Sequence, residues 1–302
     1  MGWKQALRNK VIAIVGTNAS GKSSLGVELA LHFHGEIISA DSRQVYRGLD
    51  LGSGKITIDE TKGVPHHMIN ILDPGEFFSM ADFQRISYQI IPEIIGRAHV
   101  PIIVGGTGLY VDSVLDGYML SDIVPDLDYR NELEKKSTQE LWELLEQKAP
   151  DANVDSKNRN RVMRLLERIH DGDTLTPQKA PRYESLRLGV RWPKEILDQR
   201  IDERIKVRLD AGMIEEVERL LDSGVSVNFL LGLGLEYRFI TNYILGRYQN
   251  KEAMIQDLAK AIKKFAKRQI TWFKRNTNIL WLDMQNDPKG QAIEAVSRFL
   301  EN

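Results

Sequence analysis

The sequence of 302 residues contains no cysteine, which excludes disulfide bridges, thiolate metal sites and a cysteine nucleophile. Its apolar runs have the length of strands and are too short to span a bilayer, and the first eight residues show no leader-peptide pattern. The chain also has no excess of either charge, because 41 basic and 42 acidic residues leave a formal net charge of −1. We therefore expect a cytoplasmic, monomeric protein without a membrane segment, and no nucleic-acid binding through total charge.

One segment has the form of a phosphate-binding loop. Residues 16–23 match the pattern G-x-x-x-x-G-K-[ST], between an apolar run at 10–15 and a predicted helix at 24–33. In this pattern backbone N–H groups point inward at an anion, the lysine adds a positive charge, and the final hydroxyl reaches a bound Mg²⁺ ion. The motif predicts a phosphorylated ligand and leaves open whether it is a nucleoside triphosphate. The expected contacts are Gly16, Thr17, Asn18, Ala19, Ser20, Gly21, Lys22 and Ser23.

Strand and helix signals alternate along most of the chain. Strands are predicted at 36–40, 100–104, 185–192 and 279–283, and helices at 81–97, 193–209, 214–222 and 251–275. This order indicates an α/β fold of the P-loop NTPase type, with a mostly parallel sheet flanked by helices. Ligands of such sheets bind at the carboxyl ends of the strands, where Ser20, Asp41 and Thr107 are expected. Pro92 marks a kink or a boundary, and the glycine-rich segment 225–234 is either a loop or a helix packing site.

The middle of the chain has a different texture. Strand signals stop, and charged helical segments follow at 127–148 and 159–170. We therefore predict a helical insertion domain at 121–183, within a core domain formed by 1–120 and 184–302.

Several polar residues near the predicted sheet edge are candidates for chemistry. Asp41 follows the second strand and is a candidate general base, magnesium contact or helix N-cap. The residue taken alone favours the N-cap, but the nearby phosphate-binding loop favours one of the two chemical roles. His66 and His67 lack metal-ligand spacing, which favours packing or ligand orientation. The turn Gly105-Gly106-Thr107-Gly108 offers backbone N–H groups at a helix start.

Basic residues are concentrated in two helical segments. Arg159, Arg161, Arg164 and Arg168 lie in the insertion, and a run without an acid occupies the last part of the 251–275 helix, with Phe265, Trp272 and Phe273 interleaved. The run is either the solvated face of an amphipathic helix or a surface for nucleic-acid phosphates. Its residues are Lys260, Lys263, Lys264, Lys267, Arg268, Lys274 and Arg275.

Together these blocks resemble one family, the tRNA dimethylallyltransferases of bacterial type, which prenylate adenosine 37 beside the anticodon. The resemblance covers nearly the whole chain and rests on the order of the loop at 16–23 and the blocks at 39–52, 63–74, 78–83, 104–110 and 266–273. It implies that the loop binds the diphosphate of dimethylallyl diphosphate with Mg²⁺ held near Ser23. It also implies that Asp41 accepts the proton of adenine N6 and that Thr107 positions the nucleophile or a phosphate oxygen.

The resemblance further implies contacts with the anticodon stem-loop of tRNA. The matching residues are Asp41, Ser42, Arg43, Gln44, Thr107, Asn160, Arg161, Val162, Met163, Arg164, Lys267 and Arg268.

The chain departs from the family pattern at several places, as expected of a divergent branch. Thr17 and Asn18 replace Pro and Thr, Gly54 lies where the block Gly-Thr-Ala-Lys has Ala, and Leu231 to Arg238 stands for Ala-Ile-Gly-Tyr-[KR]-Glu. Two other functions are open on the residues alone: a small-molecule or nucleotide kinase on a P-loop fold, and a non-catalytic RNA-binding paralogue.

Overall fold

The computed structural model describes residues 9–119, 126–152, 154–172 and 178–301. It divides into two compact units, Met1–Asp116 with Pro181–Asn302 and Gly117–Ala180. The insertion was expected at 121–183, so the second unit begins and ends a few residues earlier; the expected boundary at 120–121 falls outside the described residues. No helix in the described ranges combines the length and the apolar character that crossing a membrane requires.

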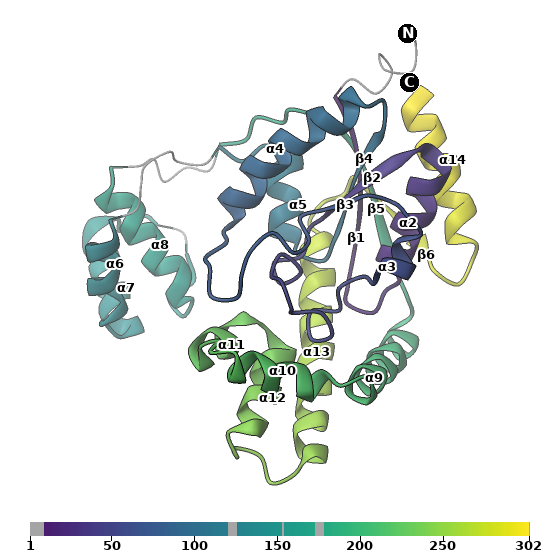
Figure 1. The fold of residues 1–302 in the computed structure, drawn as a ribbon. Helices are drawn as coiled ribbons and strands as arrows, with labels where there is room; N and C mark the ends of the chain where they lie inside the picture. Colours follow the sequence, from purple (N-terminus) through teal and green to yellow (C-terminus); the bar gives the residue numbers. More distant parts are fainter. Residues whose placement is uncertain (1–8, 120–125, 153, 173–177, 302) are drawn as a thin grey trace. The chain divides into compact units, whose positions relative to one another are not determined.

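A six-stranded sheet forms the centre of the first unit. Its order is β3-β2-β4-β1-β5-β6, and every strand pair runs parallel, as the alternation of strands and helices predicts (Figure 1). Parallel strands buried in a sheet read as apolar runs, and five of the six strands were visible in the sequence in this way; the two-residue edge strand was not. The strands are β1 (Lys10–Gly16), β2 (Gly35–Ser39), β3 (His66–His67), β4 (Val100–Gly105), β5 (Glu184–Arg191) and β6 (Ile279–Asp283).

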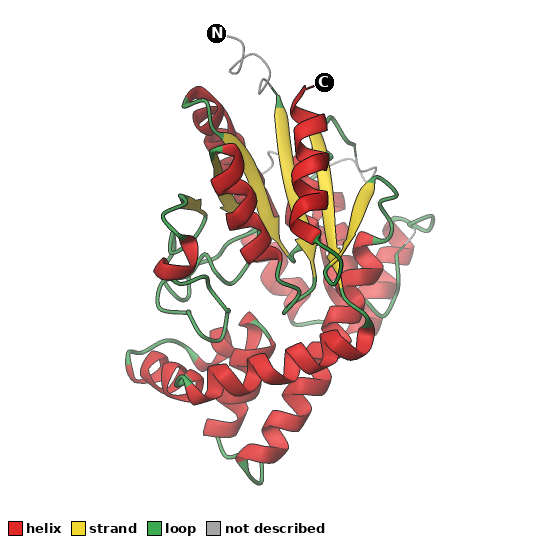
Figure 2. Ribbon diagram, turned by 90° about the vertical axis from the view of Figure 1, so that its right-hand side faces the viewer, coloured by secondary structure: helices red, strands yellow, loops and turns green. Residues whose placement is uncertain are grey.

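Helices cover both faces of this sheet (Figures 1 and 2). Ile12 and Ile14 of β1 pack with α2 (Lys22–Phe33) and α14 (Pro288–Glu301). The alternate residues Val11, Ala13 and Val15 pack on the other face with α4 (Met80–Gly96) and α5 (Gly108–Leu115). Pro92 lies within α4 without ending it, so it is not a boundary.

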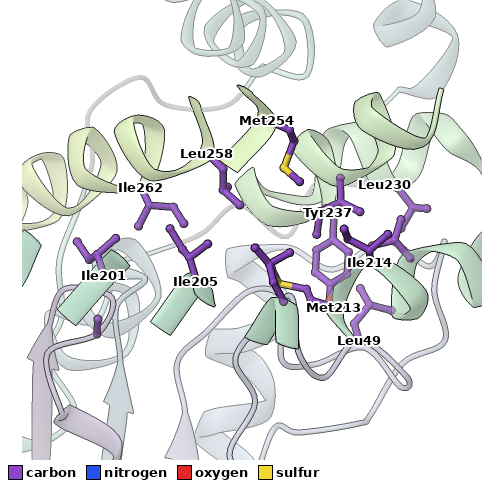
Figure 3. Close-up of a cluster of buried hydrophobic side chains, with 14 of the residues drawn as sticks. Leu49, Ile201, Ile205, Met213, Ile214, Leu230, Tyr237, Met254, Leu258 and Ile262 are labelled. Atoms are coloured by element: carbon purple, nitrogen blue, oxygen red, sulfur yellow. The ribbon is translucent and has the colours of Figure 1, made fainter. Parts of the chain in front are cut away.

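A group of helices forms a second core beyond the carboxyl ends of the strands. Ile201 and Ile205 of α9 point toward Leu258 and Ile262 of α13 (Figure 3). The glycine-rich segment left open in the sequence contains α11, and α12 follows it. The helices of this group are α9 (Lys194–Asp210), α10 (Met213–Asp222), α11 (Val227–Leu233), α12 (Leu235–Ile244) and α13 (Lys251–Phe273). The short helix α3 (Ile58–Thr61) lies in the connection between β2 and β3.

The second unit is helical and has its own apolar core of Leu133, Leu141, Leu145, Val162 and Leu166. The segment expected at 127–148 is two helices, because Ser137 caps a new helix through a capping box with Glu140. The helices are α6 (Leu127–Glu134), α7 (Thr138–Lys148) and α8 (Arg159–His170).

Candidate active site

The phosphate-binding loop connects β1 to α2 at the carboxyl edge of the sheet. Ala19 and Gly21 have φ values of 59° and 85°, which turn the backbone inward between strand and helix. The Ser20 hydroxyl donates to the Thr17 carbonyl oxygen at 2.8 Å, and Lys22 Nζ donates to the same oxygen at 3.1 Å. Lys22 is therefore folded over the loop, where its ammonium can exchange this carbonyl for a phosphate oxygen.

Gln269 of α13 joins the two glycine-rich turns. Its Oε1 accepts the Asn18 N–H at 3.1 Å, and its Nε2 donates to the Gly106 carbonyl oxygen at 3.0 Å. A Cβ atom on Gly106 would lie 2.5 Å from Gln269 Nε2, so the glycine leaves the space that this bridge needs. The basic helix α13 is thus bonded to the phosphate-binding loop, a contact that no sequence motif indicated.

Asp41 lies at the end of β2 beside the loop. No helix begins after it, because residues 42–45 form turns, so the helix N-cap interpretation is wrong. Its Oδ1 accepts the Arg43 N–H at 2.9 Å, and the Arg43 Nε lies 3.6 Å from the same oxygen. Thr107 donates its N–H to the Ala40 carbonyl oxygen and accepts the Ser42 N–H at 3.4 Å. These bonds hold the ends of β2 and β4 together around the carboxylate.

A cavity of about 710 Å³ opens between the loop, the end of β2 and α9. Volumes of this size are typical of small-molecule sites. Arg200, Arg204 and Arg208 of α9 also line it, whereas the predicted residues Gly16, Thr17, Ser42 and Thr107 do not. The predicted residues that line it are Asn18, Ala19, Ser20, Gly21, Lys22, Ser23, Asp41, Arg43 and Gln44. The α9 arginines were not among the predicted site residues, although their spacing of four residues places them on one face of a helix.

Positive charge is in excess in this cavity. Glu236 of α12 bonds Arg43 at 2.6 Å and lies 3.7 Å from Arg208. Burial, helped by the charge of Arg204, lowers the pKa of Lys22 to about 8. Burial and Arg204 likewise lower the pKa of Arg208 to about 10. Burial opposes the charge of Arg43 as well, but Glu236 and Asp41 outweigh it and raise the pKa of Arg43. An anion of several charges would relieve the repulsion among these groups.

The donors in the cavity fit a magnesium ion shared with a phosphate. Ser23 and Asp41 both line the cavity, and hydroxyl and carboxylate oxygens are the ligands that Mg²⁺ prefers. Among the described residues, no group of three or more His, Cys, Asp or Glu side chains could hold a metal by itself. This donor set agrees with the habit of Mg²⁺ of taking its remaining ligands from water and substrate phosphates.

Two predicted tRNA contacts near Asp41 are bonded inside the protein. Arg43 pairs with Glu236, and the Gln44 amide accepts from the Ser39 hydroxyl and donates to the Gly54 carbonyl oxygen. Both side chains line the cavity, so their place is in the wall of the small-molecule site.

The predicted contacts in the insertion divide between surface and core. Val162 and Met163 are buried in the apolar core of the second unit, so the prediction of RNA contact is wrong for these two side chains. Asn160, Arg161 and Arg164 are exposed on α8. Arg159 is not part of this surface set, because it donates to the carbonyl oxygens of Lys136 and Glu134.

The basic helix α13 combines both interpretations left open by the sequence. Phe273 is buried, and Trp272 Nε1 donates to Asp112 Oδ2 at 2.7 Å, so these aromatics serve packing. Lys260 and Lys263 pair with Asp257 and Asp202. The remaining basic side chains are exposed: Lys264, Lys267, Arg268, Lys274 and Arg275.

His66 and His67 have structural partners at the edge strand β3. His66 Nδ1 lies 2.8 Å from the Val64 carbonyl oxygen, and His67 Nε2 lies 2.7 Å from Glu36 Oε2. The packing interpretation therefore accounts for His67, whereas His66 also lines the cavity and fits both packing and ligand orientation.

Family models match most of this chain. The model described as IPP transferase matches residues 44–276, and the model described as isopentenyl transferase matches residues 9–72. The sequence is 42% identical over 290 residues to tRNA dimethylallyltransferase 1 of Geotalea uraniireducens, covering 94% of this chain and 96% of the relative. It is 38% identical over 308 residues to tRNA dimethylallyltransferase of Halalkalibacterium halodurans, covering 97% of each.

Solved structures share this fold. The full-length tRNA isopentenylpyrophosphate transferase of Bacillus halodurans superimposes with a TM-score of 0.74 at 37% identity, over 97% of each chain. A eukaryotic dimethylallyltransferase solved while acting on tRNA gives a TM-score of 0.82 at 24% identity, over 96% of this chain and 79% of that one. At that identity the second likeness concerns the fold alone.

Proposed function

Because this chain belongs to the tRNA dimethylallyltransferase family, we infer that it is a prenyltransferase acting on tRNA. We propose that its donor is dimethylallyl diphosphate and its acceptor N6 of adenosine 37 in tRNAs that read codons starting with U. The observation that carries this proposal is the position of Asp41 in the same cavity as the phosphate-binding loop. An anion-binding loop and a carboxylate base are what transfer from a diphosphate to an amine requires.

The loop residues act on the leaving group. The bond between the allylic carbon and oxygen breaks, and its electron pair leaves with the diphosphate. Backbone N–H groups of the loop other than that of Asn18, which donates to Gln269, and the Lys22 ammonium stabilise the charge that develops there. Lys22 is available for this because its bond in the free protein is to a neutral carbonyl oxygen.

Asp41 acts on the acceptor. As N6 attacks the allylic carbon, the new C–N bond makes the amine acidic, and its proton passes to the Asp41 carboxylate. The hydrogen bond from the Arg43 N–H and the ion pair with its guanidinium fix the direction of this carboxylate. Thr107 supports the same turn through Ser42 and is proposed to position the nucleophile or a phosphate oxygen.

A magnesium ion would be held by Ser23, with Asp41 nearby, and would supply further charge neutralisation to the diphosphate.

The target base has to leave the anticodon-loop stack to reach a site of this kind. We propose that exposed residues of α8 and α13 contact the tRNA backbone: Asn160, Arg161, Arg164, Lys267 and Arg268. A monomeric state and a cytoplasmic location remain predictions.

The substitution Asp41→Asn tests the assignment of the base. The variant keeps the shape of the side chain and the acceptor for the Arg43 N–H, so we expect transfer to fall by at least about a hundredfold while tRNA binding stays within about twofold. Transfer is measured as label from dimethylallyl diphosphate in unmodified tRNA, and binding by filter retention. Unchanged transfer in the variant would remove Asp41 from this role.

Kinase activity is the second function that the loop alone permits. It predicts phosphorylation of a small acceptor from ATP, with no label entering tRNA from the prenyl donor. The same preparation assayed with both donors separates the two functions. The family match favours the prenyl donor.

A further inference from the structure

Three guanidinium groups meet in the wall of the cavity that faces the phosphate-binding loop. Arg204 and Arg208 come from successive turns of α9, and Arg43 comes from the turn after β2. The side chains of Arg43 and Arg208 are only 12% and 13% exposed. Buried cations are normally matched by acids, yet Arg43 and Arg208 share the carboxylate of Glu236, and Asp41 forms a further ion pair with Arg43.

The sharing is unequal. Glu236 lies 2.6 Å from Arg43 but 3.7 Å from Arg208, beyond hydrogen-bond distance. Arg204 donates to the Gly54 carbonyl oxygen at 3.3 Å and forms no ion pair with any described residue. The two positive charges of this α9 pair are thus met by one long ion pair and one hydrogen bond to a neutral carbonyl oxygen.

Gly54 leaves the space that this pair occupies. A Cβ atom at this position would lie 1.5 Å from Arg208 Nη2 and 2.3 Å from Arg204 Nη2. The residue also has a φ of +63°, a conformation that favours glycine. Gly54 and Glu236 lie in two segments where the sequence departs from the family pattern, and both of them contact Arg208. The departures therefore belong to one structural feature.

We propose that Arg208 is a further ligand-binding residue of this site and contacts the second phosphate of the donor. Glu236 is the positioning residue that keeps the Arg208 side chain at the cavity wall. The phosphate-binding loop and Lys22 would hold one phosphate, and Arg204 with Arg208 the other. Arg208 then determines preference for a diphosphate over a monophosphate, because a single phosphate at the loop leaves it without a partner. This inference rests on the proposed function, which supplies the diphosphate donor.

The substitution Arg208→Met tests the proposal by calorimetry with inorganic diphosphate and inorganic phosphate in the presence of Mg²⁺. We expect diphosphate affinity to fall by about tenfold or more, the loss of one charge-assisted bond, while phosphate affinity changes by less than about threefold. The matched control is Lys206→Met, which removes an exposed positive charge from the same helix outside the cavity and leaves both affinities unchanged.

Thermal unfolding of the free protein separates ligand binding from a structural role. If Arg208 serves the ligand, its removal relieves repulsion with Arg204, and the melting temperature of Arg208→Met stays the same or rises. A lowered melting temperature with unchanged diphosphate affinity would identify a structural ion pair with Glu236 and overturn the proposal. If Arg208→Met does not fold, Arg208→Gln removes the charge and keeps a polar side chain, and wild-type diphosphate affinity in that variant overturns the proposal.

The outcomes for wild-type protein distinguish this proposal from the function on which it rests. Absence of diphosphate binding in wild type contradicts both. Tight diphosphate binding in wild type that Arg208→Met retains contradicts the role of Arg208 alone.

Discussion

Lys22 is the residue whose ionisation most directly affects the site. Its pKa is lowered to about 8 by burial first and by Arg204 next, so in the free protein it loses its charge as the pH rises through that value. A neutral lysine cannot attract the diphosphate, and affinity for the donor should therefore fall above about pH 8. Affinity falls rather than rises with pH because the protonated, positively charged form of Lys22 is the one that binds the diphosphate.

The measurement is the dissociation constant of dimethylallyl diphosphate without tRNA between about pH 7 and 9.5. We expect affinity to be constant below pH 8 and to decrease above it, by up to about tenfold for each pH unit. Lys22→Met should bind weakly and lose this pH dependence. An equally steep decrease in the variant would assign the titration to another group.

Individual site residues differ in whether the sequence could predict them. The phosphate-binding loop is contiguous, and its pattern of glycines, lysine and serine was sufficient to find it. Arg204, Arg208 and Glu236 meet through the packing of α9 and α12, so no local pattern joins them. Val162 and Met163 were assigned to the RNA surface by motif position, although helical periodicity with Leu166 places Val162 in the core.

At the scale of elements, the segment after β2 is held by a buried carboxylate from α10. Glu216 accepts the N–H groups of Asp50, Leu51 and Gly52 at 2.7–3.0 Å, and Tyr237 donates its hydroxyl to the same side chain. Burial, together with the neighbouring Glu216, raises the pKa of Tyr237, so the phenol stays protonated as a donor. The loop that carries Gly54 is thus fixed from α10 and α12.

Removing this carboxylate leaves buried N–H groups without an acceptor. We expect Glu216→Ala to lower the free energy of unfolding by roughly 3 kcal/mol, measured by urea denaturation, because several bonds to a charged group are lost together. Glu215→Ala, an exposed neighbour on the same helix, should change it by less than about 0.5 kcal/mol. Equal effects of the two substitutions would contradict the bracing role of Glu216.

The element boundaries that sequence reasoning predicted well are those with strong local signals. The helix at 159–170 agrees with α8 to the residue, and the last strand agrees with β6. Helices α3, α12 and α14 were not predicted. Gly234 separates α11 from α12, and the glycine-rich run around it concealed the helical pattern of these two helices.

At the scale of the whole molecule, a net charge of −1 has to be reconciled with a polyanionic substrate. The exposed basic residues of α13 form a local patch of positive charge, since they lie in a stretch without acids. Electrostatic attraction between such a patch and RNA phosphates is independent of the total charge. We therefore expect tRNA affinity to depend on this patch and on salt.

The double substitution Lys267→Glu and Arg268→Glu tests this expectation. tRNA affinity should fall by about tenfold or more, and the slope of log affinity against log salt should decrease by about 1 to 2, because one or two phosphate contacts are lost. Affinity for dimethylallyl diphosphate should be unchanged. Arg219→Glu, a reversal of an exposed charge on α10, provides the control. An unaltered salt slope in the double variant would place the RNA surface elsewhere.

Transfer of a dimethylallyl group to adenosine 37 is tested most directly by nucleoside mass spectrometry of a tRNA reading U-starting codons after a single turnover. The purified protein, dimethylallyl diphosphate and Mg²⁺ should convert adenosine 37 to its N6-dimethylallyl form, with one diphosphate released for each modified base. A tRNA that remains unmodified while its complex with the protein persists would contradict the account.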